Sequence, residues 1–177
     1  MKPDRLKTQL EKRARSLGFD TCHVTRAHLP DETGNRLAGF VANNHHGTME
    51  WMESTLERRR SPTAMWPQAK TAIMLGMNYG PDHNPLDDLK NTDRGTISVY
   101  ARNRDYHDVI KGRLKELAGW LASASEGDVK VFVDTAPLME KPLAGQAGTG
   151  WQGKHTNLVS RRYGSWLFIG SILTTVE

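Results

Sequence analysis

The sequence predicts an α/β fold, in the wide sense that includes α+β, with a single sheet flanked by helices. Segments with apolar residues at helical spacing alternate with short β-branched runs along the 177 residues, which is typical of helices packed on a sheet. Hydrophobic residues make up 37% and charged residues 25% of the chain, a balance that suits a globular protein with a sizeable core. We therefore expect residues 1–177 to form one domain.

The first half of the chain begins with an amphipathic helix. Apolar residues recur at helical spacing from Leu6 to Leu17, and Gly18 then favours the end of that helix. Apolar and β-branched stretches predict the next elements in order: a strand at 20–25, a helix ending near 45–47, a short helix at 49–56, a loop over the basic run and Ser61–Pro62, and a buried strand at 71–77.

The second half contains the strongest predicted helix, over residues 105–124. Asp105 suits its N-cap, and apolar residues from Val109 to Leu121 line one face. The other elements expected here are a long loop at 79–95 rich in Pro, Asp and Asn, a short strand at 97–100, a strand at 129–133, a helix at 138–147 and a final strand at 166–175. Because no closing element follows that last strand, we expect the sequence to be part of a longer chain.

Asp134 is the leading candidate for a site residue. It follows a β-branched strand, and Pro137 suits the first turn of the next helix. Ligands of open α/β sheets lie beyond the carboxyl ends of the strands. The same position also suits an ordinary helix cap, so two interpretations of Asp134 remain open here.

A glycine-dense segment follows Asp134. It does not match a Walker A loop, because Lys154 is followed by His155, and its G-x-G-x-x-G pattern has no clear strand before it. Backbone amides together with Lys154 can still hold an anionic or amide-rich ligand. The candidate residues of this segment are Gly145, Gly148, Gly150, Trp151, Gly153 and Lys154.

Charge and cysteine content narrow the function classes. The net charge is +4, with arginines clustered at 58–60 and 161–162; these clusters are either phosphate contacts or solvated surface. Cys22 is the one cysteine, which excludes a disulfide within the chain and a cysteine-bound cluster. The histidines lack metal-ligand spacing, and neither a signal peptide nor a membrane-spanning run is visible. We expect a cytoplasmic protein without a metal site of its own.

Seven motifs in order resemble the N-terminal domain of the epoxyqueuosine reductase family. Each is short, and together they run through most of the chain. They are HGTMEWM at 46–52, RRSP with AKTAI at 59–73, LGMNY at 75–79, SVYARNRDYH at 98–107, VDTAPLMEK at 133–141, AGTGWQGKHT at 147–156 and GSWLFIGSILT at 164–174.

This resemblance implies a flavin-nitroreductase-like sheet that binds cobalamin, as in cobalamin-dependent reductases. It implies an oxidoreductase that converts epoxyqueuosine to queuosine at the tRNA wobble position, as a monomer that contacts the anticodon loop and no membrane. Asp134 is implied to be the general acid, since the oxygen of an opened epoxide needs a proton, and partial burial is expected to raise the pKa of such an acid. The implied cofactor-binding residues are Tyr106, His107, Gly148, Gly150, Trp151, Gly153 and Lys154, and the implied substrate-binding residues are Lys141, Arg58 and Arg59.

The sequence departs from the family pattern in several places. Lys141 replaces an arginine and cannot form a two-pronged contact, and His155 replaces an asparagine. The resemblance implies two 4Fe-4S clusters and a helical-repeat tail in the full-length protein, whereas none of the cluster cysteines lie in this chain, so we expect the chain alone to be inactive. Two other functions stay open: a corrinoid-binding module without chemistry, and a flavin-dependent nitroreductase-like enzyme.

Overall fold

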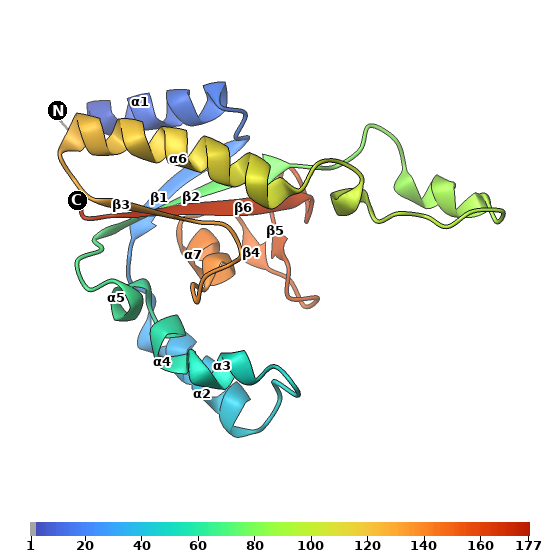
Figure 1. Ribbon diagram of the computed structural model, residues 1–177, viewed down its shortest axis with the longest axis horizontal. Coiled ribbons are helices and arrows are strands. Elements are labelled where there is room, and N and C mark those ends of the chain that lie inside the picture. The colour runs from blue at the N-terminus through green and yellow to red at the C-terminus, as the bar shows by residue number, and fades with distance from the viewer. Residues whose placement is uncertain (1–2) are drawn as a thin grey trace.

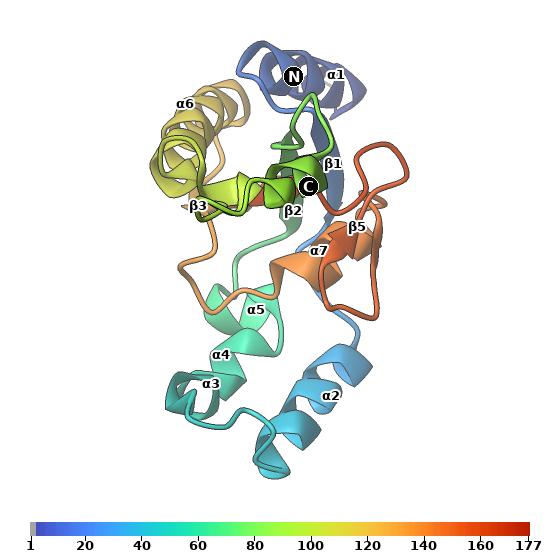
Figure 2. The same ribbon diagram turned by 90° about the vertical axis from the view of Figure 1, so that its right-hand side faces the viewer.

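The computed structural model describes residues 3–177 and is built on a four-stranded antiparallel sheet. The strand order is β1–β2–β6–β3. Two longer helices cover one face of the sheet, and one short helix with a two-stranded hairpin covers the other (Figures 1 and 2). The strands are β1 (Thr21–Arg26), β2 (Thr71–Asn78), β3 (Val129–Phe132), β4 (Trp151–Gln152), β5 (Leu158–Val159) and β6 (Leu167–Thr174).

The helices divide into three groups. The longer pair, α1 and α6, lies side by side above the sheet, α7 lies beneath it, and α2 to α5 form a small helical group further below (Figure 1). Their bounds are α1 (Pro3–Ser16), α2 (Asp31–Ala42), α3 (Glu50–Ser54), α4 (Leu56–Arg59), α5 (Pro62–Met65), α6 (Tyr106–Ser125) and α7 (Glu140–Gln146), with 3₁₀ turns η1 (Pro85–Lys90) and η2 (Val99–Ala101).

The alternation of side chains along β2 produces two cores. Ile73 and Leu75 pack with α1 and α6, whereas Ala72 and Met74 pack on the side of α7, because successive residues of a strand point to opposite faces. Because helices cover both faces of β2, the strand predicted at 71–77 is a continuous apolar run. The predicted sheet flanked by helices is thus confirmed.

Helix α6 shows how local sequence determines an element. The Asp105 side chain accepts a hydrogen bond from the His107 N–H at 2.9 Å, which satisfies one of the free donors of the first turn. Ile110, Leu114 and Leu121 form part of its buried stripe. The predicted helix and its N-cap are confirmed within one residue at each end.

The structure corrects several sequence-based expectations. All pairings of the main sheet are antiparallel, so the rule for ligands at open parallel sheets does not explain the position of Asp134. The strand predicted at 97–100 is wrong: these residues lead into η2, and Ile97 is 64% exposed. The basic run is not a loop, because Arg58 and Arg59 lie in α4. The hairpin of β4 and β5 was not predicted.

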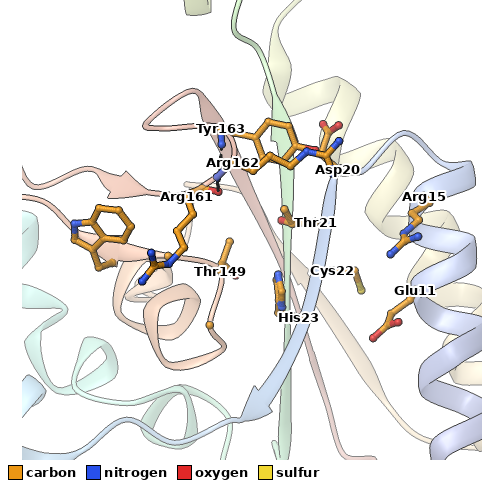
Figure 3. Close-up of a pocket in the computed structure, with 14 residues that line it drawn as sticks. Glu11, Arg15, Asp20, Thr21, Cys22, His23, Thr149, Arg161, Arg162 and Tyr163 are labelled. Atoms are coloured by element: carbon orange, nitrogen blue, oxygen red, sulfur yellow. Dashed lines mark hydrogen bonds between the residues drawn. The ribbon is translucent and has the colours of Figure 1, made fainter.

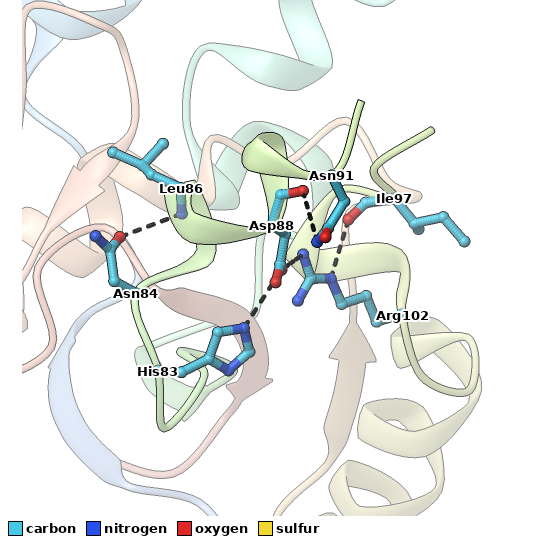
Figure 4. Close-up of polar contacts among 7 residues, drawn as sticks. All are labelled: His83, Asn84, Leu86, Asp88, Asn91, Ile97 and Arg102. Carbon is cyan, nitrogen blue, oxygen red and sulfur yellow. Dashed lines mark hydrogen bonds and ion pairs between the residues drawn. The ribbon is translucent and has the colours of Figure 1, made fainter. Parts of the chain in front are cut away.

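Residues 80–104 form an arm that extends away from the sheet (Figure 1). Asp88 lies at its centre and accepts hydrogen bonds from Arg102 Nη2 at 2.7 Å and from His83 Nε2 at 3.3 Å (Figure 4). Arg102 also donates from Nε to the Ile97 carbonyl at 3.0 Å. Polar contacts therefore give the arm its shape, and the long loop predicted here is ordered around one carboxylate.

None of the helices in residues 3–177 has both the length and the apolar composition needed to cross a membrane.

Candidate active site

A cavity of about 780 Å³ lies where β3 ends and β6 begins. Phe132 pairs with Ser171 in the sheet register, which brings the segment after β3 close to the first residues of β6. Leu167, Phe168 and Ile169 of β6 line the cavity together with residues of α2, α7 and the β4–β5 hairpin. The cavity therefore joins segments from both halves of the chain at one end of the sheet.

Asp134 projects into this cavity from the turn after β3. Its backbone has φ of 54°, a left-handed conformation that Asp adopts more readily than most residues. The Tyr106 hydroxyl donates to Asp134 Oδ2 at 3.0 Å, and His107 Nε2 lies 4.0 Å from the same oxygen. The carboxylate of Asp134 is thus held by the first turn of α6.

Tyr106 is fixed by aromatic stacking. Its ring lies parallel to Phe168, with centroids 4.0 Å apart and an interplanar angle of 6°, and it also stacks on His107 at 4.0 Å. Phe168 in turn stacks on Tyr79 at 4.2 Å. Burial and the neighbouring Asp134 carboxylate raise the pKa of Tyr106, so its hydroxyl stays protonated and remains a hydrogen-bond donor.

Glu140 supplies a second carboxyl group beside the Asp134 turn and also lines the cavity. Its Oε1 accepts from the Ser171 hydroxyl at 2.8 Å, and its Oε2 accepts from the Asp134 N–H at 3.2 Å. Burial, with a smaller contribution from the Asp134 charge, raises the pKa of Glu140 from 4.5 to about 7. Sequence analysis did not select Glu140 as a site residue; its available signal was a carboxylate at the start of a helix six residues after Asp134.

The two interpretations of Asp134 can now be separated. Helix α7 begins at Glu140, and Met139 before it provides no side-chain cap. The Asp134 carboxylate instead meets Tyr106, so the helix-cap interpretation is wrong. The expected partial burial of Asp134 is also absent, because its side chain is 68% exposed.

The structure brings four of the predicted site residues to this cavity. Tyr106, Asp134, Lys141 and Arg59 line it, and His107 contacts Asp134 from beside it. Lys141 Nζ donates to Asn157 Oδ1 at 3.3 Å, and the guanidinium of Arg59 lies over the Trp51 ring at 4.6 Å. Arg58 is not among the lining residues.

The glycine segment lies mainly at a second cavity, of about 540 Å³, beside β1 and α1 (Figure 3). Gly148, Gly150 and Trp151 line this second cavity, whereas Gly153 and Lys154 line neither. A Cβ on Gly150 would stand 2.1 Å from the Val159 carbonyl oxygen, so this glycine permits close packing of the hairpin. The predicted grouping of Asp134 with Gly148, Gly150 and Trp151 in one cavity is therefore not observed.

The hairpin nevertheless connects the two cavities. Gln152, Thr156 and Asn157 of the same segment line the Asp134 cavity. Within residues 3–177, no three His, Cys, Asp or Glu side chains come close enough together to hold a metal ion. Cys22 is partly buried, and burial raises the pKa of its thiol to about 12, which makes it a poor nucleophile near neutral pH.

Known proteins are similar to this chain in sequence and in fold. The family described as "Epoxyqueuosine reductase QueG, DUF1730" matches residues 59–135. The epoxyqueuosine reductase of Cellulophaga algicola is 38% identical over 165 residues, which cover 91% of this chain and 51% of that protein. The chain spans about half the length of the curated relatives it matches.

Two solved structures extend the comparison to the fold. An epoxyqueuosine reductase bound to an epoxyqueuosine-modified tRNA-Tyr stem loop superimposes with a TM-score of 0.82 at 26% identity, covering 98% of this chain and 46% of that one. The Bacillus subtilis epoxyqueuosine reductase, in a state with its aspartate-bearing catalytic loop swung out of the active site, has a TM-score of 0.79 at 26% identity over the same shares.

In fold and sequence this chain is similar to part of a reductase, and it has an acidic side chain in a cavity at the end of its helix-covered sheet. Among known proteins it is similar to about half of an epoxyqueuosine reductase: residues 59–135 match the DUF1730 model, and the fold superimposes over 98% of this chain.

Proposed function

We propose that this chain is the part of an epoxyqueuosine reductase that binds cobalamin and supplies the proton donor for reducing epoxyqueuosine to queuosine in tRNA. The observation that carries this proposal is the Asp134 carboxylate, held by Tyr106 at the mouth of an open cavity. Such an enzyme acts in the cytoplasm, where its tRNA substrate is found.

The residues suit the chemistry of epoxide removal. Both C–O bonds of the epoxide break, a C=C bond remains, and the oxygen leaves as water after taking up protons and an electron pair. Asp134 is the proton donor to that oxygen, because it is a carboxylic acid in the cavity with an accessible side chain. Tyr106 orients Asp134 through its hydroxyl, and its stacked ring prevents that hydroxyl from turning away.

The lining residues fit a corrin, a broad ring with an apolar face and amide groups around its edge. Leu138, Phe168 and Ile169 offer an apolar surface for the ring. Gln152 and Asn157 stand at the same cavity with amide groups that pair with those of the ligand. Cobalamin held by these residues would supply the electron pair for the reduction.

Positive charge at the same cavity suits a tRNA substrate. Arg59 and Lys141 both line it, and each can contact a phosphate of the anticodon loop. Lys141 does so as a point charge and not as a fork. Arg58 lies beside Arg59 in α4 and extends the same basic surface.

Iron–sulfur clusters that would supply electrons to cobalamin would need cysteine ligands beyond those in these 177 residues. Cys22 is the single cysteine of the chain, and each such cluster takes several cysteine ligands. We infer that the 177 residues on their own bind cobalamin without turning over with a physiological electron donor.

A spectral titration tests this proposal. The folded chain is titrated with cobalamin and, in parallel, with flavin mononucleotide; we expect cobalamin to bind, with lower affinity than in a complete reductase, and flavin not to bind. Absence of cobalamin binding at high micromolar concentration, or tight flavin binding, would contradict it. If the 177-residue chain alone turned over epoxyqueuosine tRNA with a physiological electron donor, the inference that the reaction needs iron–sulfur clusters held outside these residues would be wrong.

A further inference from the structure

Glu140 connects the Asp134 turn to the most firmly held strand of the sheet. Ser171, which anchors its Oε1, is fully buried and lies on β6. The register of β6 places Ser171 between Met74 of β2 and Phe132 of β3. A strand paired on both sides is a rigid support, so the position of Glu140 is fixed at one end by the sheet.

The other end of this connection is the main chain of Asp134. Asp134 has left the sheet and adopts a left-handed backbone conformation, which persists only where the surroundings enforce it. Its N–H donates to Glu140 Oε2 at 3.2 Å. Among the hydrogen bonds of residues 3–177, this is the bond that ties the backbone of Asp134 to another element once β3 has ended.

We propose that Glu140 is a positioning residue: anchored by Ser171, its carboxylate holds the main chain of the Asp134 turn so that the Asp134 side chain reaches Tyr106 and the cavity. The role of the turn in catalysis rests on the proposed function, whereas the mechanical connection does not. Glu140 also lines the cavity, but its two carboxylate oxygens are engaged by Ser171 and by the Asp134 N–H, so it acts through Asp134.

The charge of Glu140 determines the strength of this connection. An ionised carboxylate accepts an N–H more strongly than a protonated one. Burial raises the pKa of Glu140 to about 7, and the groups facing it are Asp134 from the turn and Tyr106 and His107 from α6. The Asp134 N–H is therefore held more tightly as the pH rises through about 7.

Nuclear magnetic resonance of the 177-residue chain measures this directly, with no need for cofactor or turnover. In the wild type we expect the Asp134 amide resonance to titrate with a midpoint near the pKa of Glu140. In Glu140→Gln the same amide should be insensitive to pH. In Glu140→Leu, which lacks an acceptor, its hydrogen exchange should be about 10- to 100-fold faster, the equivalent of one charge-assisted hydrogen bond.

Glu116→Gln and Glu116→Leu are the matched controls, because Glu116 is an exposed glutamate of α6. Both should leave the Asp134 amide as in the wild type, and exchange at Val131 in β3 should be unchanged in every variant. An Asp134 amide that neither titrates in the wild type nor loses protection in Glu140→Leu would overturn the proposal. If Glu140→Leu does not fold, the pH dependence of the Asp134 amide in wild type and in Glu140→Gln still tests the proposal.

Reductase assays on the cobalamin-loaded, cluster-containing enzyme then separate the two proposals. Glu140→Leu should lower kcat about 10-fold or more, with KM for tRNA unchanged and partial recovery in Glu140→Gln. A wild type without reductase activity would refute the proposed function and leave the amide measurements valid. A loss confined to KM would contradict a positioning role for Glu140.

Discussion

At the scale of single residues, two neighbouring carboxyl groups have different surroundings. Asp134 is largely exposed and meets Tyr106, whereas Glu140 is partly buried and meets Ser171. Paired acids whose environments differ this much commonly take different roles. In the proposed mechanism, Asp134 gives up a proton and Glu140 keeps Asp134 in position.

Asp134→Asn tests the proton donor in the complete, cobalamin-loaded enzyme. The amide keeps the shape of the side chain and accepts the Tyr106 hydroxyl, but has no acidic proton. We expect reduction of epoxyqueuosine tRNA to fall about 10²- to 10⁴-fold and cobalamin binding to change little. Product formation is measured on the tRNA itself, and turnover near that of the wild type would rule out Asp134 as the donor.

The titration of Glu140 also affects stability. Its pKa is raised from 4.5 to about 7 in the folded state, so the folded chain holds that proton more tightly than the unfolded chain. The resulting stabilisation is complete below pH 4.5 and is lost as the pH rises through about 7. Relative to Glu140→Gln, the wild type should lose on the order of 1–3 kcal/mol of unfolding free energy across this window.

Urea denaturation of both proteins between about pH 4 and pH 8 measures that difference. If the difference in unfolding free energy between wild type and Glu140→Gln stays constant over the whole pH range, Glu140 does not titrate with a raised pKa.

Asp134 could be predicted from sequence as a candidate site residue, whereas Glu140 could not. Asp134 follows a recognisable strand, and its position needs only local pattern. The role of Glu140 depends on Ser171, a residue 31 positions away that reaches it only when β6 is in the sheet. The glycine segment shows a further limit of local pattern: the close approach of Gly150 to the Val159 backbone depends on the hairpin, which the sequence did not predict.

At the scale of elements, helices and core strands were predictable and the arm was not. The apolar spacing of α6 and the continuous apolar run of β2 each point to one structure. Ile97 and Tyr100 have strong strand propensity, but at 64% and 54% exposure they meet no partner strand, and propensity without pairing does not make a strand. Within the arm, the contacts of Asp88 determine the local structure instead.

Arg102→Ala tests how the arm is held. The change removes the contacts to Asp88 and to the Ile97 carbonyl, so we expect protease cleavage within 80–104 to become about fivefold faster or more. The melting temperature should hardly change, because neither core cluster includes a residue of the arm. Arg94→Ala is the control, since Arg94 pairs only with its neighbour Asp93, and equal cleavage of the two variants would contradict this account.

At the scale of the whole molecule, stability should depend most on β6. Ile172 is fully buried and belongs to the core beneath α1 and α6. Ile172→Ala is expected to lower the free energy of unfolding by about 2–5 kcal/mol. Ile97→Ala on the exposed arm should change it by less than about 0.5 kcal/mol, and similar losses in the two variants by chemical denaturation would contradict this ranking.

The order of the strands has a consequence for biosynthesis. Thr71 pairs with Thr174, so β2 leaves the ribosome roughly a hundred residues ahead of its neighbour β6. Until that neighbour arrives, the nascent chain carries an open, apolar strand edge, the kind of surface that invites misassembly and chaperone binding. β3 also has no sheet partner until β6 has been synthesised, because it pairs with β6. A nonsense codon shortly before position 167 would therefore remove the middle of the sheet rather than a dispensable tail.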